Sequence, residues 1–326
     1  MKVLVTGAGS LLGGNLVRLL LENGFTVRAL VDPRHEPANL DGLQIEKVPG
    51  DTLDPESTQD ALSGIQAVFH CAYATVLMPP RAGWIQAVNY QGTQNLLMSM
   101  SRAGVEDLVH VGSASSFGFG TMDEPGTEES PYAGEQFRLA CFDSMRRAQE
   151  LVELYSQDGR IRGVIVNPTF MVGLYDPGDS PGREYLDYIK SRPGRYPSGG
   201  LNLIGAADAA AGVLKALGRG KHGRCYILGN HNIDHRELSG RFANALGVPR
   251  PIGLMGDREV LGRGLAGTLF GRLSGRKPAF SIETARLART TFYYSSARAV
   301  SELDLPQSPL DTVIEDACRW YADKRR

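Results

Sequence analysis

The sequence predicts an α/β fold, in which a doubly wound parallel sheet with helices on both faces is joined to a smaller C-terminal portion. Short, continuously apolar segments alternate with longer amphipathic segments through the first half of the chain, and strands buried on both faces have this pattern. A glycine-rich turn joins the first apolar segment to the first amphipathic one. After Asn167, clusters of Pro and Gly such as "YDPGDSPG" interrupt the alternation.

Each element follows from apolar continuity for a strand or from a 3.6-residue period for a helix. Strands are predicted at 2–6, 26–31, 44–48, 67–71, 107–112 and 161–167. Helices are predicted at 11–23, 55–63, 84–103 and 137–157. Two later segments, a helix at 203–217 and a strand at 224–228, are expected to return to the main sheet.

The change after Asn167 sets the predicted domain boundary. Residues 1–168 form the first domain, to which segments within 200–230 return, and residues 169–326 form mainly a ligand-facing portion. Within it, 250–278 mixes apolar residues and glycine with basic residues. We expect a loosely packed amphipathic helix over the ligand-facing portion, because glycine weakens long helices. A mobile lid or a membrane-surface helix is the alternative. The basic residues are Arg258, Arg263, Arg272, Arg276 and Lys277.

Composition narrows the class of partner. The 326 residues carry 35 Lys and Arg against 36 Asp and Glu, a balance that does not favour nucleic acid or an anionic membrane. The cysteines at 71, 141, 225 and 318 lack CxxC or metal-ligand spacing, which predicts reduced thiols, no metal and a cytoplasmic location. Without a signal peptide or a long apolar run we expect no membrane span. The expected partner is a small molecule.

The segment "VLVTGAGSLLGG" predicts a dinucleotide site. Gly7, Gly9 and Gly13 lie between a buried strand and a helix that begins near Leu11. A glycine motif indicates a dinucleotide site only when it joins a strand to a helix in this way. Glycine allows the tight turn and lets the backbone approach a pyrophosphate, which then meets free amides at the helix N-terminus. A purely structural turn is the alternative.

Six segments along the chain together resemble extended short-chain dehydrogenases/reductases of the NAD-dependent epimerase/dehydratase family: "TGAGSLLGG", "VPGDTLD", "VFHCA", "VNYQGTQNLL", "VGSASSFG" and "VNPTFMVG". The C-terminal "GLNLIGAADAAAG", "RCYILGNHN" and "FYYSSARAVSELDL" resemble dihydroflavonol reductase-like members and hopanoid-associated sugar epimerases in particular. The resemblance covers nearly the whole chain. It implies a Rossmann domain, a nicotinamide cofactor, and a homodimer through the helices 84–103 and 137–157.

The resemblance also assigns cofactor positions, with one departure. Ser10 stands where the family has a second glycine, so its Cβ is expected to crowd the pyrophosphate. Asp32 ends the second strand and can accept hydrogen bonds from both ribose hydroxyls, which favours NAD. Arg28 and Arg34 lie nearby and leave NADP possible. The full cofactor set is Gly7, Gly9, Ser10, Leu11, Leu12, Gly13, Asp32, Arg34, Asp51, Thr52, Ala72, Tyr73, Asn89 and Pro168.

Family members use a Ser, a Tyr and a Lys four residues after the Tyr, because a nearby cation must lower the phenol pKa by about three units, or about 4 kcal/mol. Counting back from "AQELV" places Cys141 at the Tyr position and Met145 at the Lys position, while Ser113 matches the serine. Tyr132 lies only 19 residues after Ser113 in a loop with Pro and Gly. We therefore expect it to lie too early in the chain to be on the active helix.

Each of these residues has a second interpretation. Cys141 and Met145 can be core residues, or Cys141 can act as a general acid or nucleophile, although no cation is predicted beside its thiol. Otherwise substrate, water or Tyr73 supplies the proton. His231 and His235 have metal-like spacing but are expected to be solvated surface residues.

The sequence thus predicts an NAD(P)-binding reductase, epimerase or lyase for a small biosynthetic intermediate. Apolar residues at Phe170, Met171 and along 252–270 favour a lipophilic or aromatic substrate over a sugar nucleotide. The alternatives are a non-redox isomerase or cyclase on the same scaffold, and a catalytically silent nucleotide-binding protein. The predicted substrate residues are Tyr73, Ser113, Asn167, Thr169, Phe170 and Met171.

Overall fold

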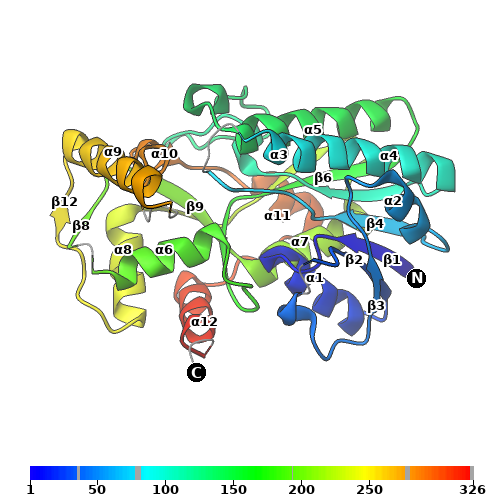
Figure 1. Cartoon of the computed structure of the whole chain (residues 1–326), viewed down its shortest axis with the longest axis horizontal. Helices are drawn as coiled ribbons and strands as arrows, with labels where there is room; N and C mark the ends of the chain where they lie inside the picture. The colour runs from blue at the N-terminus through cyan, green and yellow to red at the C-terminus, as the bar shows by residue number, and fades with distance from the viewer. Residues whose placement is uncertain (35–36, 78–81, 193, 276–279, 324–326) are drawn as a thin grey trace.

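The computed structural model describes residues 1–34, 37–77, 82–192, 194–275 and 280–323. Its main element is a parallel sheet of order β10-β6-β5-β4-β1-β2-β3, shown in Figure 1. The strands are β1 (Lys2–Thr6), β2 (Thr26–Val31), β3 (Glu46–Pro49), β4 (Ala67–His70), β5 (Asp107–Val111), β6 (Arg162–Pro168) and β10 (Cys225–Leu228). This order confirms the predicted Rossmann α/β fold.

Two helical layers cover the sheet (Figure 1). One layer holds α1 (Leu11–Glu22), α7 (Ala206–Arg219) and α11 (Ala297–Leu303). The other holds α2 (Pro55–Ala61), α3 (Gly83–Gln86), α4 (Gly92–Ala103) and α5 (Ala140–Gln157). Leu12 and Leu16 of α1 pack against Val5 on the first face, and Leu96 of α4 packs in the cluster of Leu4 and Val68 on the second. Alternate strand residues therefore supply two cores.

The C-terminal portion is built around a second sheet. β9 (Gly200–Gly205) pairs with β11 (His231–Asp234), β13 (Thr291–Phe292) and β7 (Phe170–Val172). β8 (Arg195–Tyr196) pairs with β12 (Gly253–Leu254). The helices here are α6 (Pro181–Lys190), α8 (His235–Ala245), α9 (Asp257–Ser274), α10 (Ile282–Leu287) and α12 (Leu310–Asp323). Phe242, Leu186 and Tyr321 share its core.

Three predicted elements differ in the structure. The helix expected at 84–103 is interrupted by a π-helical turn, Ala87–Gln91. The helix expected at 137–157 begins at Ala140, because Arg138 adopts a left-handed conformation with φ 55°. The helix expected at 203–217 begins at Ala206, since 200–205 form β9, and the strand near 224–228 pairs with β6 in the main sheet.

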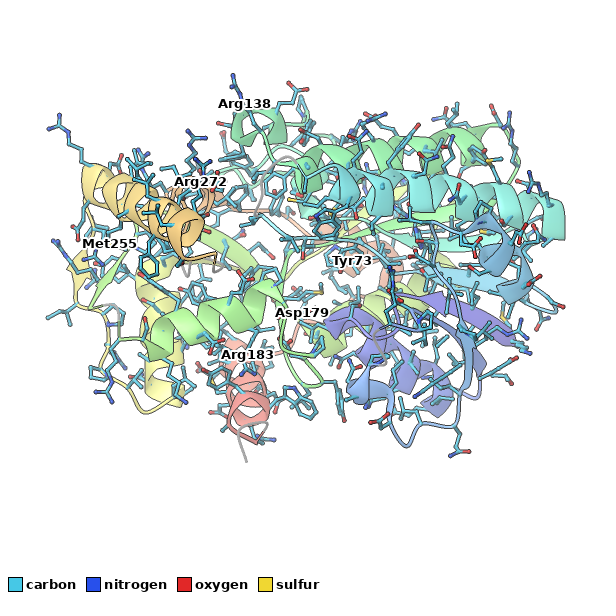
Figure 2. All side chains as sticks on the ribbon, in the orientation of Figure 1. Tyr73, Arg138, Asp179, Arg183, Met255 and Arg272 are labelled. Atoms are coloured by element: carbon cyan, nitrogen blue, oxygen red, sulfur yellow. The ribbon has the colours of Figure 1, made fainter. Side chains whose placement is uncertain are left out.

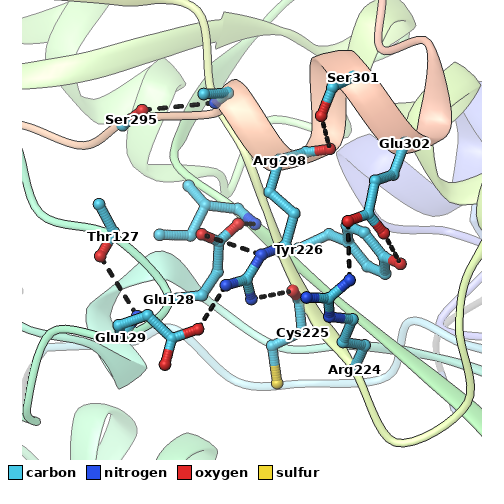
Figure 3. A network of polar contacts seen from close by, with 12 residues as sticks. Thr127, Glu128, Glu129, Arg224, Cys225, Tyr226, Ser295, Arg298, Ser301 and Glu302 are labelled. Carbon is cyan, nitrogen blue, oxygen red and sulfur yellow. Dashed lines mark hydrogen bonds and ion pairs between the residues drawn. The ribbon is translucent and has the colours of Figure 1, made fainter.

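A polar network ties the late helix α11 to the outer strand β10 (Figure 3). Glu302 accepts hydrogen bonds from Arg224 at 2.7 Å and from the Tyr226 hydroxyl at 2.9 Å. On the same strand, the Ile227 amide donates to Glu128 at 2.8 Å. Side chains thus satisfy backbone groups at a sheet edge that would otherwise be open to pairing.

Over the part of the chain that the structure describes, no helix is both long and apolar enough to cross a bilayer. The segment predicted at 250–278 contains α9, whose buried stripe Val260, Gly264, Thr268 and Gly271 faces α10. Arg276 and Lys277 lie outside the described residues.

Candidate functional site

The site lies at the carboxyl ends of β1 and β4, neighbouring strands at which the strand order reverses. Such a switch point opens a crevice for ligands in doubly wound sheets. Gly7 follows β1 with φ +65°, and a Cβ there would lie 2.4 Å from the Cys71 carbonyl oxygen. A Cβ on Gly13 would lie 2.1 Å from the Gly7 carbonyl oxygen. Both positions therefore require glycine, which brings turn, strand and helix into backbone contact.

Ser10 caps the helix that faces this crevice. Its hydroxyl accepts a hydrogen bond from the Gly13 amide at 3.0 Å, as expected of an N-cap residue. The capping hydroxyl therefore competes with a phosphate for that amide, although its own hydrogen remains able to donate. Leu11 and Leu12 are buried in the core, so only their backbone amides can serve a phosphate group.

Acidic and basic side chains meet where the adenosine ribose would be bound. Arg34 forms a bidentate ion pair with Asp32, with nitrogen to oxygen distances of 2.8 Å, and reaches Asp51 at 3.2 Å. These hydrogen bonds and charges raise the pKa of Arg34 further. The Asp51 carboxylate also accepts from the Leu53 amide, and the Thr52 carbonyl accepts from the Asn95 side chain. The carboxylate of Asp32 thus partly neutralises the cation that could bind a 2′-phosphate.

The loop after β4 forms the floor of the crevice. Asn89, in the π-helical turn, binds both the amide and the carbonyl of Ala74 and donates to Ser144 on α5 at 2.9 Å. π-helical turns are frequent at functional sites. Ala72 and Tyr73 precede the clamped residue and line a small crevice with Asn89.

Tyr73 is the phenol that lies in this crevice. Figure 2 shows it in the centre of the molecule, between the main sheet and the C-terminal portion. It lines the crevice together with Met145 and Gly112. Burial raises the pKa of its hydroxyl, so the phenol stays protonated at neutral pH. Its hydroxyl has no hydrogen-bond partner among the described residues.

Ser113 follows β5 and is held by its neighbours. Its hydroxyl oxygen accepts from the Ser115 amide at 3.2 Å and from the Ser115 hydroxyl at 2.9 Å. The buried Asn167 donates to the Ser113 carbonyl at 3.1 Å and to Gln149 at 2.8 Å. Because the Ser113 oxygen already accepts two hydrogen bonds, its own hydrogen is available to a bound ligand.

Cys141 and Met145 lie one turn apart at the start of α5, and both are buried. Burial raises the pKa of the Cys141 thiol to about 12, and the Asp143 carboxylate adds to the rise. No cation among the described residues acts to lower that pKa. The thiol therefore stays protonated at neutral pH and is a poor nucleophile.

Tyr132 lies in the loop that precedes α5 and not on the helix itself. Its hydroxyl donates to Asp143 at 2.7 Å, so the loop does reach the first turn of α5. Counting residues from Ser113 could not show this, because the loop doubles back. Burial, and then the hydrogen bond to Asp143, raise the pKa of Tyr132, which holds its proton between the two oxygens.

An apolar cluster surrounds Cys141. Its buried members are Ile85, Phe137, Leu139 and Cys141, and partly buried residues complete it: Ala74, Val76, Leu77, Ala82, Phe119, Ala140, Phe142, Leu287 and Phe292. The rings of Phe119 and Phe292 lie 4.7 Å apart between centroids, and those of Phe137 and Phe292 lie 5.6 Å apart. Little in the sequence indicates this cluster, since its phenylalanines are far apart in the chain.

The predicted site residues at the end of β6 and just after it contact different parts of the structure. Pro168 is buried, and Thr169 donates to the Asn202 side chain at 2.8 Å. Phe170 contacts Tyr185 edge to face, and Met171 packs against the main core. These two side chains are only partly buried, yet the contacts place them in the packing between the two sheets.

His235 is buried, which corrects the prediction of a surface residue. Its ring stacks on Tyr185, and burial lowers its pKa to about 4. His231 instead contacts the Ser308 carbonyl at 2.9 Å. Within the described ranges, no group of three or more His, Cys, Asp or Glu side chains could hold a metal ion.

The structure thus brings Tyr73, Asn89 and Met145 together around one crevice, and the glycine turn packs against the backbone of Cys71 and Ala72. Ser113 directly follows Gly112, which lines the same crevice. Gln149, which sequence reasoning missed, lies behind them and links α5 to Asn167. The sequence feature that could have identified Gln149 is a polar residue on the inward face of the helix, two turns after Cys141. The residues fit a dinucleotide, because the glycine turn between β1 and α1 places the N-terminus of a helix at this edge of the sheet.

The chain belongs to the NAD dependent epimerase/dehydratase family, whose model matches residues 3–229. It is 32% identical over 322 residues, 97% of this chain and 93% of the relative, to a protein of Synechocystis sp. named "Putative dihydroflavonol 4-reductase". It is 29% identical over 330 residues, 99% of each protein, to "Sterol demethylase protein B" of Methylococcus capsulatus. The crystal structure of gox2253 is similar over 99% of this chain and 98% of that chain, with 30% identity and a TM-score of 0.85. These findings confirm the resemblance and agree with NAD as cofactor.

Proposed function

We propose that this protein is an NAD-dependent reductase that converts a ketone on a lipophilic, ring-containing molecule to an alcohol. The observation that carries the proposal is the apolar, aromatic cluster around Cys141, which includes Ala74 of the loop after β4. Such a wall suits an apolar ring and offers few hydrogen bonds to a sugar. The names of two relatives, which refer to a flavonol and a sterol, support the same substrate class.

The cofactor assignment rests on the glycine turn and on Asp32. Gly7, Gly9 and Gly13 permit the tight turn that would bring backbone amides to the pyrophosphate, and Asp32 would accept the ribose hydroxyls while repelling a 2′-phosphate. The bound cofactor supplies the hydride. We accordingly propose NAD over NADP.

We propose that Cys141 and Met145 occupy the positions of the family Tyr and Lys, and that Tyr73 takes over the proton. The Ser113 hydroxyl orients the substrate oxygen by donating to it. Because the Tyr73 pKa is raised by burial, the phenol gives a proton readily only to a strong base such as a developing alkoxide. The missing cation therefore favours reduction over oxidation at neutral pH.

The test is loss of NADH absorbance with apolar cyclic ketones and, in parallel, with nucleotide sugars. Tyr73→Phe should lower kcat for the ketone by about 10²-fold or more and leave the dissociation constant of NADH unchanged. Tyr155→Phe, near the far end of α5, is the matched control and should retain activity. Full activity in Tyr73→Phe, or turnover of nucleotide sugars alone, would contradict the proposal.

One observation favours a second candidate, a nucleotide-binding protein without redox chemistry. The protonated thiol of Cys141 and the neutral Met145 provide no acid–base pair on α5. A protein of this kind would bind NAD and ligand without any change in absorbance, so the same assay distinguishes the two candidates.

We also propose a homodimer and a cytoplasmic location. Trp84, Met98 and Leu154 are exposed on α3, α4 and α5, the helices that the family resemblance assigns to a dimer interface. All four cysteines are free thiols, which supports a reducing compartment.

A further inference from the structure

The outer face of α9 carries an exposed apolar ridge. Leu265, Leu269 and Leu273 follow one another at four-residue spacing, with exposed fractions of 54, 50 and 89%, and Phe270 beside them is 66% exposed. Residues four apart lie on the same side of a helix. Contiguous exposed apolar side chains of this size mark an interaction surface more often than isolated ones.

The orientation of α9 is fixed, so this ridge cannot turn inward. Val260, Gly264 and Gly271 form the opposite, buried stripe. A Cβ on Gly264 would lie 2.6 Å from the Ala285 Cβ of α10, which shows how close the two helices are. The Thr268 hydroxyl also accepts a hydrogen bond from the Ile282 amide at 2.9 Å.

Basic residues border the ridge. At 100° per residue, Arg263 and Arg272 lie on opposite edges of the outer face, and Arg258 lies at its N-terminal end. Arg258 and Arg272 form no ion pair with any residue that the structure describes. From 250 to 275 the sequence has four arginines against Asp257 and Glu259. The local charge is thus +2, although the whole chain has a net charge of −1.

We propose that the outer face of α9 docks on the surface of an anionic lipid bilayer. Leucine and phenylalanine would enter the boundary between headgroups and acyl chains, and the arginines would extend to the phosphates. A second copy of this face fits less well, because a two-fold contact would bring like charges together. Ile252 and Leu254, in the segment that leads into α9, are also exposed.

The docked face is connected to the proposed substrate cluster. α10, which supports α9, carries Leu287 into the apolar cluster around Cys141, and β13 follows with Phe292. Figure 1 shows α9 and α10 together at one end of the molecule. A lipophilic substrate taken from the bilayer would therefore meet this cluster. This link rests on the proposed function, whereas the docking itself does not.

The experiment is co-sedimentation of the full-length protein with vesicles of phosphatidylglycerol and phosphatidylcholine. We expect binding to mixed vesicles and at least tenfold weaker binding to phosphatidylcholine alone. The double variant Leu269→Ser with Leu273→Ser should lose at least tenfold in partition coefficient. The double variant Arg258→Gln with Arg272→Gln should lose about 30-fold, at about 1 kcal/mol for each arginine.

Met122→Ser, which changes an exposed apolar residue elsewhere, is the matched control and should bind as wild type. Equal binding by wild type and the leucine variant would overturn the proposal. A change from dimer to monomer in the leucine variant, measured without lipid, would also overturn it in favour of a second copy. Turnover of a water-soluble ketone by the same variant should equal wild type, so failure of the proposed reaction is distinguishable from failure of docking.

Discussion

The helices α1 and α5 both begin at the edge of the candidate site, but their first turns differ in chemistry. Ser10 caps α1 by accepting a hydrogen bond from the Gly13 amide with its hydroxyl, and Asn39 donates to the Gly9 carbonyl beside it. α5 begins after the buried Leu139, which provides no side-chain cap, and continues with buried Cys141. A polar helix start of this kind suits a charged group, whereas an apolar helix start suits an apolar one.

Gly13→Val should have the largest effect, because it would disrupt the glycine turn at the start of α1. Its Cβ would lie 2.1 Å from the Gly7 carbonyl oxygen, so helix and turn must separate. We expect a loss of about 3 kcal/mol or more in the free energy of unfolding, measured by urea denaturation, with no detectable NAD binding by calorimetry. Gly218→Ala, exposed on α7, should instead stabilise by about 0.5–1 kcal/mol. Unchanged binding by Gly13→Val would refute the turn as cofactor site.

Asp32→Asn tests whether Asp32 makes the proposed cofactor site prefer NAD over NADP. The change removes the carboxylate that pairs with Arg34 and leaves the guanidinium for a 2′-phosphate. We expect the ratio of NADP to NAD affinity to rise about tenfold, or about 1.4 kcal/mol. Fluorescence titration with both reduced cofactors measures it, and Asp234→Asn, at the N-cap of α8 in the C-terminal portion, serves as control. A ratio that does not move would contradict the role of Asp32.

Cys141→Ala tests whether the thiol at the start of α5 takes part in catalysis. The thiol pKa of about 12 leaves little thiolate at pH 8, so alkylation should be slow in the folded protein and should speed up as the pH approaches the pKa. We expect activity within threefold of wild type and a loss of about 1 kcal/mol in stability. Rapid alkylation at pH 7 together with inactive Cys141→Ala would show that the thiol is catalytic after all.

Ser10→Gly should have the smallest effect. It restores the family glycine and frees the Gly13 amide, so NAD should bind a fewfold more tightly. Loss of the cap should cost only a few tenths of a kcal/mol, because glycine is itself tolerated at an N-cap. Calorimetric titration against wild type checks the first expectation, and a weaker NAD complex would indicate that the serine hydroxyl donates to the phosphate.

The sequence by itself determined the sheet, the glycine turn and the position of Cys141 and Met145 on one helix. These features depend on local periodicity and on residues close together in the chain, such as Gly7 to Gly13. The same local reasoning misplaced the start of α5, because the left-handed Arg138 that precedes it leaves no mark in an apolar pattern.

Only the tertiary structure decided the rest. The pair of Tyr132 with Asp143, the burial of His235 and the cluster that joins Phe119 to Phe292 all depend on contacts between distant segments. Whether the leucines of α9 face a core or the outside was likewise set by where α10 packs against them. Such contacts are fixed by side-chain packing in three dimensions, which a one-dimensional pattern does not encode.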